Sequence, residues 1–180
     1  MSLHADASAE LRAWSPPNAA QAELRDAFLD HLDTYADGVW RTCAPAHLTA
    51  SAVILDRIQR AILLVLHHKV GRWLQPGGHC EVDDASLGAA ALREATEESN
   101  VEGLMLVPGI LHVDRHPAPC NPGVVEEHFD VRYLVLAPAG SVAVASEESI
   151  DARWFGWDEL PEGIDPTIVA MLMAGRERLS

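Results

Sequence analysis

The stretch from Gly77 to Val101, read as GGHCEVDDASLGAAALREATEESNV, constrains the fold more than any other part of the chain. It opens with two glycines, crosses a short acidic loop and continues with the composition of a helix. At about 100° per residue, Glu94, Glu97 and Glu98 fall within one arc of this helix, and small apolar residues take the neighbouring arc. We therefore expect a helix that packs on one side and presents carboxylates on the other.

These three glutamates suggest a cation site. Carboxylates that converge at this spacing repel each other unless a cation lies among them, and Mg²⁺ takes oxygen ligands of this kind and shares its remaining positions with water and phosphates. The alternative is a solvated helix face with an ion pair between Arg93 and Glu97. The glycine pair and the acidic loop directly in front of the helix favour the metal site. We expect a turn at Gly77 and Gly78, which can adopt positive φ angles and let the backbone approach a phosphate.

The same stretch resembles the signature of the Nudix hydrolases, the MutT-like proteins, written G-x5-E-x7-R-E-U-x-E-E-x-G-U with U aliphatic. The matching residues are Gly78, Arg93, Glu94, Ala95, Glu97, Glu98 and Val101.

Two positions depart from the signature. The acidic loop holds one extra residue, so Ala85 stands where the first glutamate belongs. That glutamate normally supports the arginine, and Asp84, Asp83 and Glu81 are the candidates to replace it. The last glycine is Asn100, which is the next best residue for a left-handed helix end.

The resemblance implies a fold, a reaction and a set of roles. The expected fold class is α/β (α+β in some schemes), an α/β/α sandwich with a mixed sheet. We expect a hydrolase domain over residues 46–180 and a helical extension over residues 1–45. The reaction implied is hydrolysis of a pyrophosphate bond in a nucleoside diphosphate linked to another moiety, with Mg²⁺ or Mn²⁺ as cofactor.

In this interpretation Glu94, Glu97 and Glu98 bind the metal, one of them or a loop carboxylate is the general base, and Arg93 orients the glutamates. The expected substrate-binding residues are Gly77, Gly78, His79, Glu126 and Glu127, the last two at the end of a Pro-rich loop from Asp114 to Glu127.

Two other functions stay open at this point. A prenyl-diphosphate isomerase uses a related fold and needs a catalytic cysteine and glutamate, for which Cys80 or Cys120 is available. A non-catalytic nucleotide-binding module is the second alternative, because the position of the first glutamate is disturbed. The retention of Glu94, Glu97 and Glu98 together argues against that module.

The rest of the sequence predicts strands and two flanking helices. A helix capped by Asn18 either packs on the core or forms a homodimer. On the strand 128–137, His128, Asp130 and Arg132 share one face, which is either a substrate surface or a solvated face with an Asp130–Arg132 ion pair. The expected strands are His47–Leu55, Ala61–His67, Trp73–Gln75, Leu104–Val113 (interrupted at Pro108–Gly109), His128–Ala137 and Ala152–Trp157, and Asp165 caps a final helix. No carboxylate partner at fixed spacing accompanies His67, His68 or His79, so these histidines are not predicted to bind metal.

Composition limits the partners. The formal net charge of −14 argues against a nucleic-acid polymer as partner, and it means that an anionic substrate needs metal ions to approach. No apolar run is long enough for a membrane span, and the N-terminus lacks the pattern of a secretory signal. Three cysteines, Cys43, Cys80 and Cys120, are odd in number and widely spaced, which predicts free thiols in a reducing cytoplasm.

Overall fold

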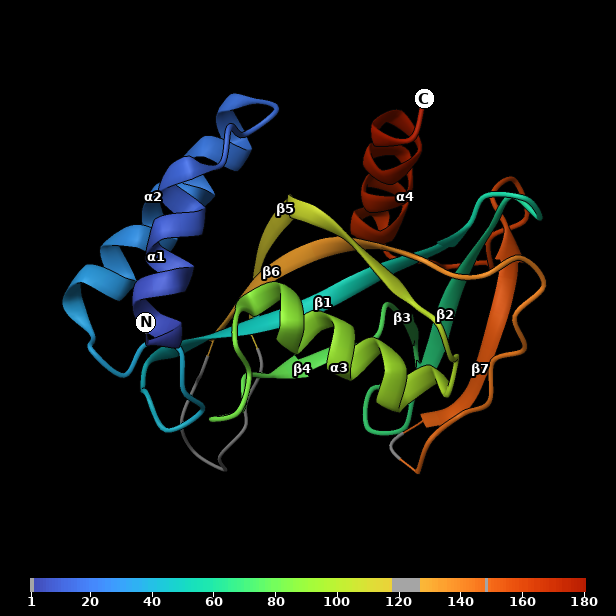
Figure 1. Cartoon of the computed structure of the whole chain (residues 1–180), viewed down its shortest axis with the longest axis horizontal. Helices are drawn as coiled ribbons and strands as arrows, with labels where there is room; N and C mark the ends of the chain where they lie inside the picture. Colours follow the sequence, from blue (N-terminus) through green and yellow to red (C-terminus); the bar gives the residue numbers. More distant parts are fainter. Residues whose placement is uncertain (1, 118–126, 148) are drawn as a thin grey trace.

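A computed structural model of the chain describes residues 2–117, 127–147 and 149–180. Helices and strands alternate irregularly along these residues, as expected for an α+β arrangement (Figure 1). The elements are α1 (Leu3–Ala13), α2 (Ala19–Thr34), β1 (Ala46–Asp56), β2 (Ala61–His67), β3 (Trp73–Leu74), β4 (Gly77–His79), α3 (Leu87–Ser99), β5 (Met105–Pro117), β6 (Glu127–Leu136), β7 (Ser149–Gly156) and α4 (Pro166–Arg178).

Among the described residues, one mixed sheet of seven strands forms the centre of the fold. Its main path runs β3-β2-β1-β6-β5, while β4 pairs with β1 and β7 pairs with β2. The long central strands β1 and β6 are parallel, with His47 opposite His128 and Ser51 opposite Arg132. The other pairs are antiparallel. The prediction of a mixed sheet is therefore confirmed.

The two faces of β1 are covered by different helices. Leu48 and Ala50 belong to a buried cluster with side chains of α1, α2 and α3, whereas Val53 and Leu55 pack with α4. Because successive side chains of a strand point to opposite faces, α3 and α4 lie on opposite sides of the sheet (Figure 1). The fold is thus the α/β/α sandwich that the sequence predicts.

Local signals in the sequence explain where several elements begin and bend. Asn18 caps α2 by accepting from the N–H of Gln21, and Asp165 caps α4 ahead of Pro166. The register of β5 against β6 shifts next to Pro108–Gly109, where Gly109 has a φ of 90°. One expectation is wrong in part: Asp114–Pro117 is not loop, because β5 continues through these residues and pairs with β6 up to Glu127.

The N-terminal helices pack on the body of the protein. Phe28 and Leu32 of α2 are buried, and the Phe28 ring stacks on Phe129 of β6 with centroids 4.6 Å apart. Full burial of an aromatic side chain such as Phe28 contributes about 1.5–3 kcal/mol. Of the two roles considered for α2, packing on the core is therefore observed.

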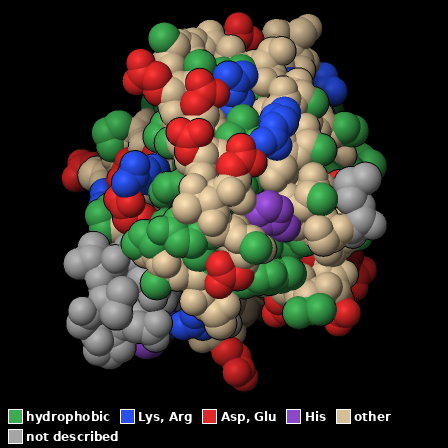
Figure 2. Space-filling model, turned by 90° about the vertical axis from the view of Figure 1, so that its left-hand side faces the viewer, with side chains coloured by type: hydrophobic (Ala, Val, Ile, Leu, Met, Phe, Trp, Pro, Cys, Tyr) green, Lys and Arg blue, Asp and Glu red, His purple; other side chains and the backbone are tan. Residues whose placement is uncertain are grey.

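The helix α1 was not predicted from the sequence. It buries Leu3, Ala7 and Leu11, an apolar stripe that is narrow and contains a small residue, so its periodic signal is weak. On the outward side of α1 and α2, ion pairs such as Arg12–Asp33 lie exposed. Figure 2 shows acidic and basic side chains interspersed on this side of the molecule. Among the described residues no helix is both long and apolar enough to cross a membrane.

Candidate active site

The predicted carboxylates lie on α3, and both ends of this helix are fixed by single side chains. Ser86 accepts a hydrogen bond from the N–H of Ala89 at 3.0 Å at the start. Asn100 ends the helix with φ 51° and ψ 25°, and its N–H donates to the Thr96 carbonyl. The left-handed helix end predicted for Asn100 is confirmed. Ala91 and Ala95 are fully buried against the sheet, which directs the acidic arc away from the core.

Arg93 is anchored by Asp84, which resolves the question of the missing glutamate. The guanidinium donates to both carboxylate oxygens, with Nε–Oδ1 at 3.0 Å and Nη2–Oδ2 at 2.9 Å. Such a bidentate pair fixes the plane of the guanidinium as well as its position. Asp84 also accepts from the backbone N–H of Glu81 at 2.7 Å, so the loop holds the carboxylate in place. Asp83, by contrast, is exposed.

The remaining donors of Arg93 reach the glutamates and β4. Its Nη1 donates to Glu94 at 2.9 Å and to Glu97 at 3.2 Å, and its Nη2 donates to the carbonyl of His79 at 3.0 Å. The expected ion pair between Arg93 and Glu97 is present, but it belongs to a larger network. One guanidinium therefore ties the acidic loop, α3 and β4 together.

The three glutamates differ in exposure. The side chain of Glu97 is 60% exposed, whereas that of Glu94 is 13% exposed, and Glu98 is buried. Glu98 accepts from the backbone N–H of Gly77 at 3.2 Å. Glu94 and Glu98 thus lie between α3 and β4, and Glu97 faces solvent. This set of oxygen atoms, partly buried and partly open, has the chemistry that a hard divalent cation requires.

The reason for the glycine pair differs from the one expected. Gly77 and Gly78 lie in strand β4, and neither belongs to the described residues with positive φ, so the prediction of a glycine turn is wrong. Their small size matters instead. A Cβ on Gly78 would lie 2.7 Å from Oε1 of Glu94, and a Cβ on Gly77 would clash with Ser51. The glycines let α3 and β1 approach β4 closely.

The opposite charges of Asp84 and Arg93 stabilise each other. Burial alone raises the pKa of Asp84, but the hydrogen bonds from Arg93 and from the Glu81 N–H outweigh it, so the pKa lies below its usual range. The same hydrogen bonds with Asp84, together with those to Glu94, raise the pKa of Arg93 despite its partial burial. Both groups are therefore charged at neutral pH.

Of the other predicted site residues that the structure describes, His79 contacts this network and Glu127 does not. His79 extends from β4 beside the glycines, and its carbonyl accepts from Arg93. Glu127 begins β6 and accepts from Nε of Arg115 at 2.9 Å, so it has a partner on β5. Glu126 lies outside the described residues. The structure connects His79 to the carboxylates through its backbone, and it records no contact of Glu127 with them.

A buried polar cluster on β1 and β6 was not predicted as such. Asp130 accepts from Thr49 at 3.1 Å, from Ser51 at 2.8 Å and from Arg132 at 2.7 Å, and Arg132 also donates to Asp114 at 2.8 Å. The Asp130–Arg132 ion pair is confirmed, but the face is not solvated, because both side chains are buried. The sequence does carry a signal for this cluster: polar residues occupy alternate positions of both predicted strands.

Histidines gather at the end of the same face. The rings of His47, His79 and His128 lie with centroids 4.8–5.1 Å apart, and His116 lies 5.5 Å from His128. Burial lowers the pKa of His128 to about 3, and the neighbouring imidazoles add to the effect, so this ring is neutral near pH 7.

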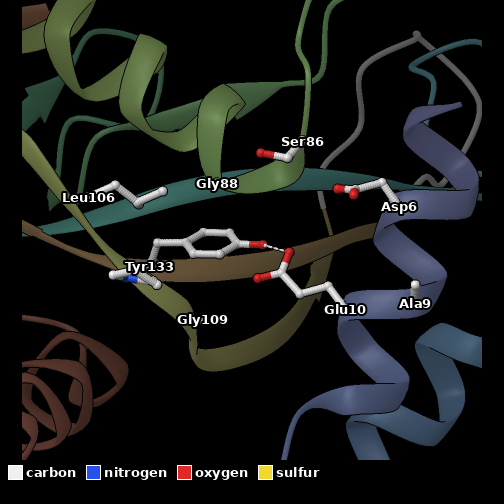
Figure 3. Close-up of a pocket in the computed structure, with 9 residues that line it drawn as sticks. Asp6, Ala9, Glu10, Ser86, Gly88, Leu106, Gly109 and Tyr133 are labelled. Carbon is white, nitrogen blue, oxygen red and sulfur yellow. Dashed lines mark hydrogen bonds between the residues drawn. The ribbon is translucent and has the colours of Figure 1, made fainter. Parts of the chain in front are cut away.

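A separate cavity of about 370 Å³ lies between α1, the start of α3 and the strands β5 and β6. The Tyr133 hydroxyl donates to Glu10 at 2.7 Å across it, as Figure 3 shows. Burial raises the pKa of both groups. Its lining residues are Asp6, Ala9, Glu10, Ser86, Gly88, Leu106, Pro108, Gly109 and Tyr133, which include none of the predicted site residues.

Solved structures share this fold. A NUDIX-family hydrolase from Clostridium perfringens has a TM-score of 0.58 and 23% identity, and the match covers 74% of this chain and 98% of that one. An Ap4A hydrolase from C. elegans has a TM-score of 0.57 and 18% identity over 73% and 96% of the two chains. An ADP-ribose pyrophosphatase from Streptococcus suis has a TM-score of 0.50 and 24% identity over 72% and 91%.

The comparison with curated proteins gave no match. The NUDIX domain family, in contrast, matches residues 45–173, which is more than half of the chain and includes α3 and the whole sheet. The chain therefore belongs to the Nudix family of hydrolases.

Proposed function

We propose that this Nudix-type pyrophosphohydrolase cleaves a pyrophosphate bond in a nucleoside diphosphate linked to another moiety, with Mg²⁺ or Mn²⁺ bound by Glu94, Glu97 and Glu98. The observation that carries the proposal is the approach of Glu94 to Gly78 and of Glu98 to Gly77, with Arg93, held in place by Asp84, reaching both Glu94 and Glu97. The names of the similar Ap4A hydrolase and ADP-ribose pyrophosphatase support a nucleotide substrate.

The carboxylates fit such a cation. Nudix hydrolases generally use divalent metals. Glu94 approaches the backbone at Gly78 so closely that any side chain there would displace it, so the position of its oxygens is tightly defined. When bound, divalent cations neutralise charge on phosphate oxygens and lower the pKa of a coordinated water.

The chain's own residues have distinct parts in this proposal. Glu94 and Glu98 offer partly buried oxygens, and the exposed Glu97 offers oxygens at the solvent side. One of the three glutamates or a loop carboxylate accepts the proton of the attacking water as general base. Arg93 positions Glu94 and Glu97, because its donors already point at carboxylates and at the His79 carbonyl. Gly77, Gly78 and His79 lie beside these groups and are proposed to contact the diphosphate, and Glu126 and Glu127 the attached group.

The alternatives receive less support. An isomerase needs a reactive cysteine, but burial raises the pKa of Cys80 to about 12, so its thiol is not ionised near neutral pH. Cys120 lies outside the described residues. The binding module was suggested by the disturbed first glutamate, and Asp84 now supplies the partner of Arg93.

We also propose the division of the chain into a helical extension (1–45) and the hydrolase domain (46–180). A cytoplasmic location is proposed as well, in keeping with the free thiols of Cys43 and Cys80.

The test is a hydrolysis screen over nucleoside diphosphate derivatives, including ADP-ribose and Ap4A, with phosphate release measured in Mg²⁺, in Mn²⁺ and after chelation. We expect one preferred substrate, hydrolysed only with metal. Glu98→Gln should abolish turnover and keep the wild-type circular dichroism spectrum, whereas Glu102→Gln, a control at an exposed position just beyond α3, should behave as wild type. Wild-type turnover in Glu98→Gln would remove the proposed metal site.

A further inference from the structure

We propose that His47, His79 and His128 form a second metal site, for Zn²⁺ or another divalent transition metal that prefers nitrogen ligands. It uses none of the carboxylates of α3. Of the residues proposed for hydrolysis it shares only His79, whose backbone carbonyl accepts from Arg93 and whose side chain points to the other face of the sheet. Its three residues are far apart in the sequence, because they come from β1, β4 and β6.

The geometry of the three rings carries the proposal. One ring nitrogen of each histidine lies within 4.8 Å of the other two. A Zn²⁺ ion bound to imidazole nitrogens at 2.0–2.1 Å with tetrahedral angles keeps those nitrogens roughly 3.3–3.4 Å apart. Small changes in side-chain torsion angles therefore close the triangle around an ion. Three imidazoles leave a fourth position for water, as in other zinc sites with three protein ligands.

The sheet fixes where the rings lie. His47 and His128 are directly opposite on the parallel pair β1–β6, and His79 is opposite Thr49, two residues along β1 from His47. Opposite residues project to the same face, and so do residues two apart on a strand. All three imidazoles are therefore directed to one face by paired backbone, which is a more rigid support than a loop.

A backbone carbonyl next to His47 orients its imidazole in the way that is common for metal-binding histidines. The Nδ1 of His47 lies 3.4 Å from the Cys43 carbonyl oxygen, and donation there makes Nε2 the nitrogen that carries the lone pair. A backbone carbonyl behind a metal-binding imidazole fixes its tautomer and the orientation of its ring.

The two metal sites differ in both place and chemistry. Gly78 of β4 faces Glu94, while the next residue, His79, points to the opposite face of the sheet. Carboxylate oxygens suit Mg²⁺ and Mn²⁺, whereas imidazole nitrogens suit Zn²⁺, Co²⁺, Ni²⁺ and Cu²⁺. A three-residue strand thus separates a hard-cation site from a transition-metal site.

The probe is Co²⁺ added to the full chain, because its visible absorption distinguishes four-coordinate nitrogen ligation from six-coordinate oxygen ligation. We expect an intense d–d band that saturates at one ion per chain and that Zn²⁺ removes by displacement. His79→Gln and His128→Gln should each weaken Co²⁺ binding by roughly 10–100-fold, a loss at least as large as that of an outer-shell partner. His79 and His128 are both half-buried, unlike His47, so either variant serves if the other does not fold.

The controls separate this site from others. His68→Gln removes an exposed histidine in the turn after β2 and should leave the band unchanged. Glu98→Gln should abolish hydrolysis but keep the band, so that failure of the proposed function and failure of this site are distinguished. A wild-type chain without the band, or a band that survives in folded His79→Gln and His128→Gln, would overturn the proposal. Loss of the band in Glu98→Gln would place the ion among the carboxylates instead.

Discussion

The anchor of Arg93 gives the sharpest prediction, which is that Asp84→Asn destabilises the protein and slows hydrolysis. Asp84 is 6% exposed and accepts three hydrogen bonds, two from Arg93 and one from the N–H of Glu81. Asparagine has nearly the same shape, but it keeps one acceptor oxygen and turns an NH₂ group toward a donor. The substitution therefore removes one charge-assisted hydrogen bond and the opposite charge.

The expected magnitude follows from these contacts. A hydrogen bond to a charged group contributes about 1.5–3 kcal/mol, and breaking a fully buried ion pair costs about 3–5 kcal/mol. Arg93 is 21% exposed, so water replaces part of what is lost. We expect the free energy of unfolding to fall by about 2–3 kcal/mol, which for a chain of this length lowers Tm by roughly 4–12 °C.

Activity should fall as well, because Arg93 also holds Glu94 and Glu97. A displacement of catalytic groups by about 1 Å can cost on the order of a hundredfold in rate, so a loss of roughly 10–100-fold in kcat is expected. Urea denaturation followed by circular dichroism measures the first effect, and metal-dependent phosphate release measures the second. Asp83→Asn is the matched control: it makes the same change one residue away at an exposed position, and its effect on stability should stay within about 0.5 kcal/mol.

The pH dependence gives an independent check on the anchor. The pKa of Asp84 is lowered in the folded state, so its stabilisation is present above the unfolded pKa of about 3.9 and is lost as the pH falls through the folded value. Asp84→Asn should therefore cost less at acidic pH than at pH 7. Equal unfolding free energies for Asp84→Asn and Asp83→Asn at pH 7 would refute the reasoning.

Three further substitutions test other parts of the structure. Gly78→Ala places a Cβ 2.7 Å from Oε1 of Glu94 and should lower kcat by more than about tenfold; unchanged kinetics would mean that Glu94 is free to move. Burial raises the pKa of Glu10 above that of an exposed glutamate, so the free energy of unfolding falls as the pH rises through the folded value. Glu10→Gln, which keeps an acceptor for Tyr133, should therefore stabilise the protein more at pH 7 than at pH 4, and urea midpoints that show no pH-dependent gain would contradict this. Cys80→Ala should retain the full rate of phosphate release, since its thiol has a pKa of about 12, whereas loss of turnover in the folded variant would favour the isomerase chemistry.

Local patterns predicted the helix and its carboxylates well. The caps at Asn18 and Asp165 and the left-handed end at Asn100 depend on a few neighbouring residues, so the sequence contains all the information they need. The same holds for the arc of Glu94, Glu97 and Glu98, because helical periodicity is a local property.

Features that depend on contacts between segments far apart in the sequence were not predicted or were interpreted wrongly. Gly77 and Gly78 were expected to form a turn. Glycine is required there instead because α3 and β1 lie so close to β4 that a larger side chain would clash, and no local sequence pattern reveals this contact. The Asp130–Arg132 pair was predicted, but its burial depends on the network with Thr49 and Ser51 across the parallel strands. The histidine cluster was not predicted, since His47 and His128 are far apart in the chain and meet only through the β1–β6 register.

The charges around α3 leave Arg93 little capacity to bind a phosphate group by itself. Asp84, Glu94, Glu97 and Glu98 have four formal negative charges and Arg93 one positive charge, which leaves −3 for the group. Arg93 already donates to three of these carboxylates and to a carbonyl, so it has little capacity left for a substrate oxygen. Two unit charges 4 Å apart interact by about 4 kcal/mol at an effective dielectric constant of about 20, so an incoming diphosphate meets strong repulsion. The net charge of −14 adds to this repulsion at longer range. Divalent cations at the glutamates are therefore expected to be needed for substrate to approach the site as well as for the chemical step.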